Sequence, residues 1–205
     1  MSVALYRVSM TTALPRPTPE ELAAAWSRLV PDVIAPDLRV LFCGINPGLY
    51  SAATGYHFAR PGNRFWPALH RSGFTPRQYS PAEQERLLEL GLGITNLVER
   101  ATAGAAELRA AELREGAERL LEKVRTHRPR WVAFLGLGAY GTAFGAPRPK
   151  VGATAPLDGG TGVWVLPNPS GLNAHYGLAE LAAAFAELRR AASDRRASGA
   201  DGAGG

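Results

Sequence analysis

The sequence predicts an α/β fold, a three-layer αβα sandwich around a central, mainly parallel sheet of four strands. Two observations predict it. Short apolar runs, typical of strands buried on both faces, alternate with longer segments of helical periodicity. Helix-starting and helix-ending residues separate these segments, so that each strand is followed by a helix returning across the sheet. With 205 residues, 46% of them hydrophobic and 20% charged, the chain is expected to form one domain with one sizeable core.

The first part of the chain is expected to contain an arm, a helix and a strand. Residues 1–17 show no periodicity and include several Thr and Pro residues, which predicts a flexible arm. Thr18-Pro19-Glu20-Glu21 has the pattern of a capping box with proline at the first helical position, so a helix is expected from there to Val30. An unbroken apolar run predicts the first strand over residues 39–43. The single cysteine, Cys43, is expected to be a buried free thiol in a reducing cytoplasm.

The remaining elements continue the alternation. Further strands are expected over residues 94–98, 131–135 and 163–166, and helices over residues 63–71, 81–90, 107–127 and 176–192. The second of these helices follows a capping-box pattern that begins at Ser80, and Gly91 is expected to end it. Residues 193–205 consist of Gly, Ala, Ser, Arg and Asp and are expected to form a disordered tail, which places the folded domain at residues 18–192.

One glycine-rich segment suggests an alternative function. Gly136-Leu137-Gly138-Ala139-Tyr140-Gly141 follows an expected strand and matches the G-x-G-x-x-G pattern of dinucleotide-binding enzymes, so an NAD(P)-dependent oxidoreductase is one interpretation. That mechanism also requires an acidic residue at the end of a strand roughly 20 positions later. Residues 146–150 do not have the pattern of a strand, and Asp158 lies in a glycine-rich loop. A tight strand-to-helix turn is therefore the favoured interpretation.

Two other loops have the residues of a functional site. Ligands of open α/β sheets bind at the carboxyl ends of the strands, and Gly44-Ile45-Asn46-Pro47-Gly48 follows the first expected strand. Asn46 is expected to point into a cleft there, although asparagine before proline is also a common start of a turn. Pro167-Asn168-Pro169-Ser170-Gly171-Leu172-Asn173 follows the last expected strand and places an apolar residue, Leu172, near the tip of a polar loop.

Together these two loops resemble the signature loops of the mismatch-specific uracil/thymine-DNA glycosylases, a family within the uracil-DNA glycosylase superfamily. The resemblance also includes Asn63-Arg64-Phe65-Trp66 and residues 93–100, and it spans roughly residues 39–190. It implies a monofunctional base-excision-repair enzyme that flips uracil, and also thymine or modified pyrimidines, out of a G·U or G·T mismatch in double-stranded DNA. The enzyme would hydrolyse the N-glycosidic bond and leave an abasic site. A non-catalytic mismatch-binding module on the same fold is a further alternative, against which the presence of Asn46 argues.

The resemblance also implies roles for the residues around the base. Asn46 would orient the attacking water through its side-chain carbonyl group. Backbone groups of Ile45 and Phe58 would hold the base, and the Phe58 ring would stack on it, although core packing also explains this ring. Gly48 leaves open the space that an aromatic residue fills in the strict uracil enzymes, so thymine could enter. Two further residues belong to the expected base pocket: Ser51 would lie near the base, and Asn96 would either contact it or cap the following turn.

The second loop would contact the DNA. By resemblance, Asn168 and Ser170 would contact the flipped nucleotide or its phosphates, while Leu172 would act as a wedge that fills the gap left by the base. Gly171 and Asn173 would flank the wedge and meet the widowed guanine. Many relatives have an arginine soon after the wedge, whereas this chain has Asn173-Ala174-His175-Tyr176, so phosphate contacts are expected from His175 or Arg64 instead.

The overall composition is consistent with DNA as the partner. Lys and Arg number 23 against 18 Asp and Glu, and the pI is about 9.8, which suits a polyanionic ligand. The irregularly spaced histidines and the single cysteine predict no metal site, and no cofactor is expected. No apolar stretch approaches the roughly 18 residues of a membrane span and no secretion signal is recognisable, so a cytoplasmic protein is expected. The protein is also expected to be a monomer.

Overall fold

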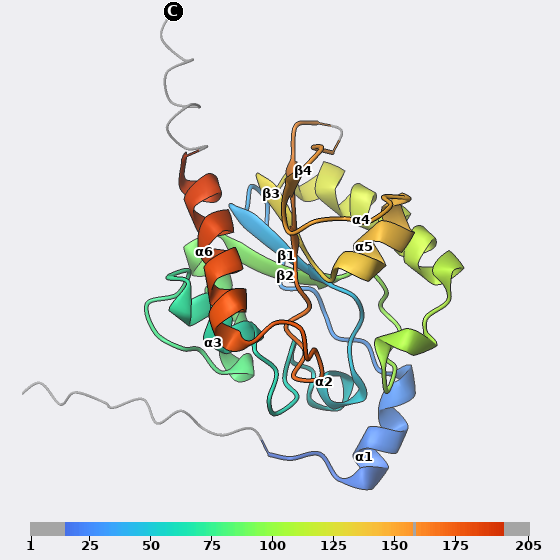
Figure 1. Ribbon diagram of the computed structural model, residues 1–205. Helices are drawn as coiled ribbons and strands as arrows, with labels where there is room; N and C mark the ends of the chain where they lie inside the picture. The colour runs from blue at the N-terminus through green and yellow to red at the C-terminus, as the bar shows by residue number, and fades with distance from the viewer. Residues whose placement is uncertain (1–14, 158, 195–205) are drawn as a thin grey trace, which may run out of the picture.

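A five-stranded sheet lies at the centre of the computed structural model, which describes residues 15–157 and 159–194 (Figure 1). Its strands are β1 (Val40–Gly44), β2 (Leu92–Asn96), β3 (Trp131–Leu135), β4 (Gly152–Thr154) and β5 (Gly162–Leu166). They are arranged in the order β2-β1-β3-β5-β4, in which the first four strands are parallel and β4 runs antiparallel to β5. The predicted α/β class and the mainly parallel sheet are confirmed.

Helices cover both faces of this sheet, as Figure 1 shows. One face packs against α3 (Phe65–Arg71), the 3-10 helix η2 (Pro81–Leu90) and α6 (Leu178–Asp194). The other face packs against α4 (Ala110–His127) and α5 (Leu137–Phe144). The remaining helices are short: α1 (Pro19–Ala23), η1 (Ala24–Ser27), α2 (Leu49–Thr54) and η3 (Ala105–Glu107). Two of the three layers are therefore helical, as predicted.

The central strand β1 contributes side chains to both hydrophobic cores. Phe42 packs on one face against Phe65, Phe74 and Phe185, with ring centroids 5.4–5.7 Å apart. Its neighbour Cys43 lies in the core on the opposite face, where burial raises the pKa of the free thiol. A strand buried on both faces needs an unbroken apolar sequence, because successive side chains point to opposite sides.

The predicted number of strands was wrong, because β4 was missed. This strand has only three residues, two of them exposed, and it pairs with β5 at the edge of the sheet. It is held by backbone hydrogen bonds and not by burial, so it has no apolar pattern. The helix α2 was also missed, because its six residues lie between Gly48 and the left-handed Gly55, within a segment rich in loop-forming residues.

Several predicted boundaries also shift. The capping box at Thr18 is present, but α1 passes into η1 and ends at Ser27 instead of Val30. The chain is extended at Arg28, and Val30 packs in a small cluster with Ala52 of α2. The final helix reaches Asp194, so two residues of the expected tail are helical.

The other expected elements are displaced by a few residues. The segment over 94–98 is β2, which begins and ends two residues earlier, and the helices expected from residues 63, 107 and 176 begin at Phe65, Ala110 and Leu178. Of the expected arm, residues 15–17 are neither helix nor strand, whereas residues 1–14 and 195–205 lie outside the described residues. No helix in the described part of the chain is long and apolar enough to cross a membrane.

Candidate active site

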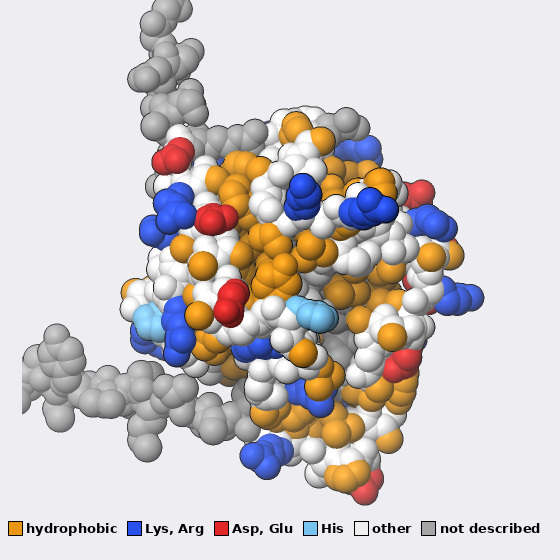
Figure 2. Space-filling view, viewed as in Figure 1, with side chains coloured by type: hydrophobic (Ala, Val, Ile, Leu, Met, Phe, Trp, Pro, Cys, Tyr) orange, Lys and Arg blue, Asp and Glu red, His pale blue; other side chains and the backbone are white. Residues whose placement is uncertain are grey.

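The carboxyl ends of the parallel strands bring together the loops that sequence analysis selected. In Figure 1 the segment after β5 lies beside α2, which follows β1. Figure 2, viewed from the same side, shows the surface hollowed in this region, with hydrophobic side chains and a histidine at the border. Nine of the predicted site residues line one pocket here: Ile45, Asn46, Gly48, Ser51, Phe58, Asn96, Asn168, Ser170 and Leu172.

The pocket has the size of one aromatic ring. Its volume is about 160 Å³, close to the roughly 150 Å³ of a protein cavity that admits one benzene molecule. A single pyrimidine ring therefore fits this volume. Of the described residues that line this pocket, only Arg60 has a permanently charged side chain.

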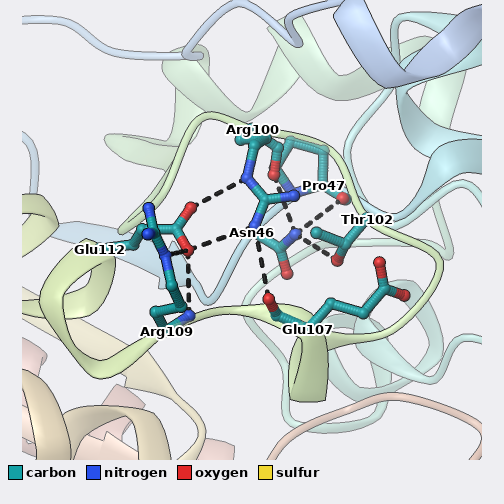
Figure 3. Close-up of polar contacts among 7 residues, drawn as sticks. All are labelled: Asn46, Pro47, Arg100, Thr102, Glu107, Arg109 and Glu112. Carbon is teal, nitrogen blue, oxygen red and sulfur yellow. Dashed lines mark hydrogen bonds and ion pairs between the residues drawn. The ribbon is translucent and has the colours of Figure 1, made fainter.

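The side chain of Asn46 is held in one orientation by three oxygen atoms. Its Nδ2 donates to the backbone oxygen of Arg100 at 2.9 Å, to Oγ1 of Thr102 at 2.7 Å and to the backbone oxygen of Pro47 at 3.2 Å. Figure 3 shows the amide nitrogen directed at these oxygens and Oδ1 directed away from them. None of the hydrogen bonds between Asn46 and the other described residues uses Oδ1, so this acceptor is available to a water molecule at the pocket.

The loop that orients Asn46 is itself fastened by an ion pair. Arg100 donates to Glu112 with Nε–Oε1 at 2.9 Å, and its Nη2 lies 3.5 Å from the backbone oxygen of Glu107 (Figure 3). The hydrogen bond from Arg100 lowers the pKa of Glu112 to about 2, so this contact persists at any physiological pH. Thr102 also pairs with the backbone of the first loop, because its nitrogen donates to Pro47 and its carbonyl accepts from Leu49.

Phe58 forms part of the pocket wall in a backbone conformation that is uncommon for a phenylalanine. Its φ of 53° lies in the left-handed region, where strain is tolerated at functional sites. The ring stacks on Phe65, with centroids 4.2 Å apart, and also lines the pocket. Gly44 makes this arrangement possible, since a Cβ there would lie 3.2 Å from Cζ of Phe58 and 2.5 Å from Oδ1 of Asn96.

Asn96 is oriented by a buried histidine that sequence analysis did not select. The Nε2 of His57 lies 2.9 Å from the backbone oxygen of Pro31, and its Nδ1 lies 3.3 Å from Nδ2 of Asn96. The carbonyl group of Pro31 can only accept, so Nε2 is the protonated nitrogen and Nδ1 accepts from Asn96. Burial lowers the pKa of His57, which favours this neutral form, and it outweighs the opposite effect of the bond to Pro31.

Gly48 and Ser51 differ in what they contribute. A Cβ at Gly48 would meet nothing within 4 Å, and this glycine has an ordinary φ of −74°, so its small size leaves open space and is not required by the backbone. Ser51 is buried, and its Oγ accepts from the backbone nitrogen of Ala59 at 3.2 Å. Ser51 thereby fixes the backbone next to Phe58.

The loop after β5 is cross-linked by its own side chains. Oδ1 of Asn168 accepts from Ser170, while Oγ of Ser170 accepts from the backbone nitrogen of Leu172. Asn173 donates to the backbone of Asn168 and accepts from the backbone of His175. These bonds expose the tip of the loop, where Leu172 is 74% exposed.

Four of the predicted DNA-facing residues lie outside the pocket. Asn173 and His175 line a larger neighbouring groove of about 510 Å³, which shares Leu172 and Ser170 with the pocket. Gly171 packs against a backbone carbonyl, and the guanidinium group of Arg64 is directed into the loop itself.

Two of the three glycines of the G-x-G-x-x-G segment are explained by close packing, whereas a Cβ at Gly138 would meet nothing within 4 Å. Gly136 has a φ of 147°, and a Cβ there would lie 2.9 Å from Cδ1 of Ile45. A Cβ at Gly141 would lie 2.9 Å from the backbone oxygen of Ala146. These contacts support the interpretation of a tight strand-to-helix turn. Within the described part of the chain, no three His, Cys, Asp or Glu side chains are grouped as a metal site would require.

Three functional candidates were missed by sequence analysis: His57, Arg60 and Thr102. Each reaches the pocket from a segment without a recognisable motif, and the contacts that reveal His57 and Thr102 join residues 26 to 56 positions apart.

A comparison with known protein families identifies the superfamily of this chain. A family model of the uracil DNA glycosylase superfamily matches residues 31–190, which include every strand of the sheet and all the lining residues of the pocket. The chain therefore belongs to the uracil DNA glycosylase superfamily.

Proposed function

We propose that this protein removes uracil from G·U mismatches in double-stranded DNA, and thymine or modified pyrimidines from the corresponding mismatched positions. Membership of the superfamily supports a DNA glycosylase that acts on uracil in base excision repair. The observation that carries the proposal is the fixed amide of Asn46, whose Nδ2 is bonded and whose Oδ1 is available to water.

In the proposed reaction, the flipped base occupies the pocket and leaves with the electron pair of the N-glycosidic bond. The water held by Oδ1 of Asn46 adds to C1′, so that a hydroxyl group replaces the base and an abasic site remains. The proton that the water loses passes through solvent to the departing base anion, which is released as the neutral base. An amide is too weak a base to remove a proton early, which suits a reaction in which bond breaking leads. None of the described pocket-lining residues is a lysine, which supports attack by water and not by an amine.

Two features support a preference for mismatches and a broad choice of base. A wobble pair costs less free energy to open than a Watson–Crick pair. A base in a mismatch is therefore extruded into the pocket more easily, which favours mismatches as substrates. The open space beside Gly48 would accommodate the methyl group of thymine.

The deciding experiment is a single-turnover assay in EDTA on duplexes with one central G·U, G·T, A·U or G·C pair. Release of free uracil from G·U, with an alkali-labile site left in the strand, is expected, and the rate should fall in the order G·U, G·T, A·U. Absence of any abasic product at enzyme excess would refute the proposal. Tight binding to G·U without release would identify a mismatch-binding module instead. Asn46→Ala is the matched inactive control.

A further inference from the structure

Arg64 has an unusual position for an arginine close to a proposed DNA-binding loop, because its charge is turned inward. It precedes α3, and its Nη1 donates to the backbone oxygen of Tyr176. Its Nη2 donates to the backbone oxygens of Ser170 and of Asn173, the latter at 2.8 Å. In the described part of the chain, none of the ion pairs involves Arg64.

The three carbonyl groups that Arg64 binds lie on both sides of Leu172. Ser170 precedes Leu172 by two residues, Asn173 follows it, and Tyr176 lies where the loop approaches α6. A planar guanidinium group presents its donors at fixed angles, so one side chain can hold three oxygens in one arrangement. The backbone of Arg64 adds a further link, since its nitrogen donates to the carbonyl group of Pro169 at 2.9 Å.

A second contact brings the same two segments together. A Cβ at Gly171 would lie 2.6 Å from the backbone oxygen of Gly62, so the loop and the turn before α3 touch through their backbones. The loop over residues 168–176 is therefore seated on the segment over residues 62–64, with Leu172 projecting from it.

We infer that Arg64 is a positioning residue that sets the shape of this loop before DNA binds and holds Leu172 ready to enter the duplex. The inference rests on the proposed function, in which Leu172 fills the place of the flipped base. Without the guanidinium group, the loop would have to be ordered when DNA binds. Fixing the backbone of one residue costs conformational free energy that corresponds to roughly a tenfold change in rate.

The test compares Arg64→Met, which keeps the apolar stem but removes the donors, with Arg71→Gln, an exposed arginine at the other end of α3. Single-turnover base release is measured on A·U, G·U and single-stranded uracil. Arg64→Met is expected to slow release about tenfold from A·U, less from G·U, and hardly at all from single strands. Arg71→Gln should change none of these rates. An equal loss on all three substrates would indicate a general structural role and would overturn the inference.

Combination with Leu172→Ala shows whether Arg64 acts through the wedge. If it does, Arg64→Met/Leu172→Ala is no slower on A·U than Leu172→Ala alone, whereas multiplied losses would overturn the inference. Should Arg64→Met fail to fold, Arg64→Lys retains a charge without the planar fork and is expected to show the same substrate dependence more weakly. Equal rates of Arg64→Lys and the unmodified protein on A·U would count against the inference.

Hydrogen exchange separates this inference from the proposed function, because it needs no activity. Backbone amides of Ser170, Leu172, Asn173 and His175 are bonded within the loop. In Arg64→Met the peptide over residues 168–176 should exchange at least several-fold faster, while β1 and β3 stay protected. Unchanged exchange of the loop would overturn the inference even if the enzyme is active, and faster exchange would support it even if uracil is not the substrate.

Discussion

His57 and Asn96 meet in the wall of the pocket, where Nδ1 of the imidazole accepts from Nδ2 of the amide over 3.3 Å. Both side chains are buried, and the bond from Nε2 of His57 to Pro31 determines which ring nitrogen is free to accept. The arrangement directs the hydrogen-bonding groups that Asn96 presents to a bound ring. Protonation of Nδ1 would place two donors face to face and force the amide to turn.

We therefore expect base release to fall in acid because His57 becomes protonated. Its folded-state pKa lies below the ordinary value of 6.5, so the unfolded chain takes up the proton first as the pH falls. The stability that neutral His57 provides is complete above about pH 6.5 and is lost as the pH falls through the folded-state pKa. Single-turnover rates on G·U and melting temperatures should therefore both decline in acid and be flat from about pH 6.5 to 8.

His57→Gln provides the control for this pH dependence. A neutral amide can donate to Pro31 and accept from Asn96, so the variant should keep part of the rate at neutral pH. Its rate should no longer show the acid decline assigned to position 57. A decline of unchanged midpoint and depth in His57→Gln would show that another group is responsible.

Asn46→Ala should slow the chemical step by about 100-fold or more, because one positioning group for the nucleophile is removed. Binding to a duplex with an abasic site should be retained within a few-fold. Thr102→Val should cause a smaller loss, about tenfold, since Asn46 keeps its bond to the backbone of Arg100. Thr126→Val, an exposed threonine on α4, is the matched control. A rate for Asn46→Ala within twofold of the unmodified protein would refute its proposed role.

The elements that sequence analysis predicted correctly are those with a local signal. β1 has an unbroken apolar run because it is buried on both faces, and the capping boxes at Thr18 and Ser80 join residues three positions apart. β4 and α2 lack such signals, since backbone pairing stabilises the first and tertiary packing the second. The site divides in the same way. Asn46 and Leu172 belong to recognisable loops, whereas Thr102 and His57 act through contacts between distant segments.

Gly48→Tyr should narrow the range of bases that the enzyme accepts. The position has open space and an ordinary backbone conformation, so the melting temperature should hardly change. The added ring should abolish release of thymine and larger bases from mismatches with guanine and retain part of the release of uracil. Gly48→Ala, which adds one methyl group, should give an intermediate ratio. Release of thymine at the original rate by Gly48→Tyr would show that this space does not receive the methyl group.

Arg60→Gln should weaken the dependence of DNA binding on salt. Arg60 is exposed at the pocket, and no hydrogen bond or ion pair of its side chain is found among the described residues. If it binds a phosphate of the flipped nucleotide, its loss should reduce the slope of log K against log[salt] by about 0.9. Arg125 lies in the last turn of α4, which leads into the amino end of β3, whereas the pocket lies at the carboxyl ends of the strands, so Arg125→Gln should leave the slope unchanged. Equal slopes for Arg60→Gln and the unmodified protein would exclude a phosphate contact.

Leu172 allows function and packing to be separated, because they predict opposite results for one substitution. Its side chain is 74% exposed, so Leu172→Ala should change the free energy of unfolding by about 0.5 kcal/mol or less. A core leucine would instead lose roughly 2 to 5 kcal/mol. As a wedge, Leu172 occupies the gap left by the flipped base, and its loss should matter most where the base is hardest to extrude. The rate of Leu172→Ala should therefore fall most on A·U, less on G·U and least on single-stranded uracil. Thermal melts and single-turnover rates on these three substrates measure both effects. A large drop in melting temperature together with an equal rate loss on all substrates would end the wedge hypothesis, because the side chain would then act on the fold and not on the duplex.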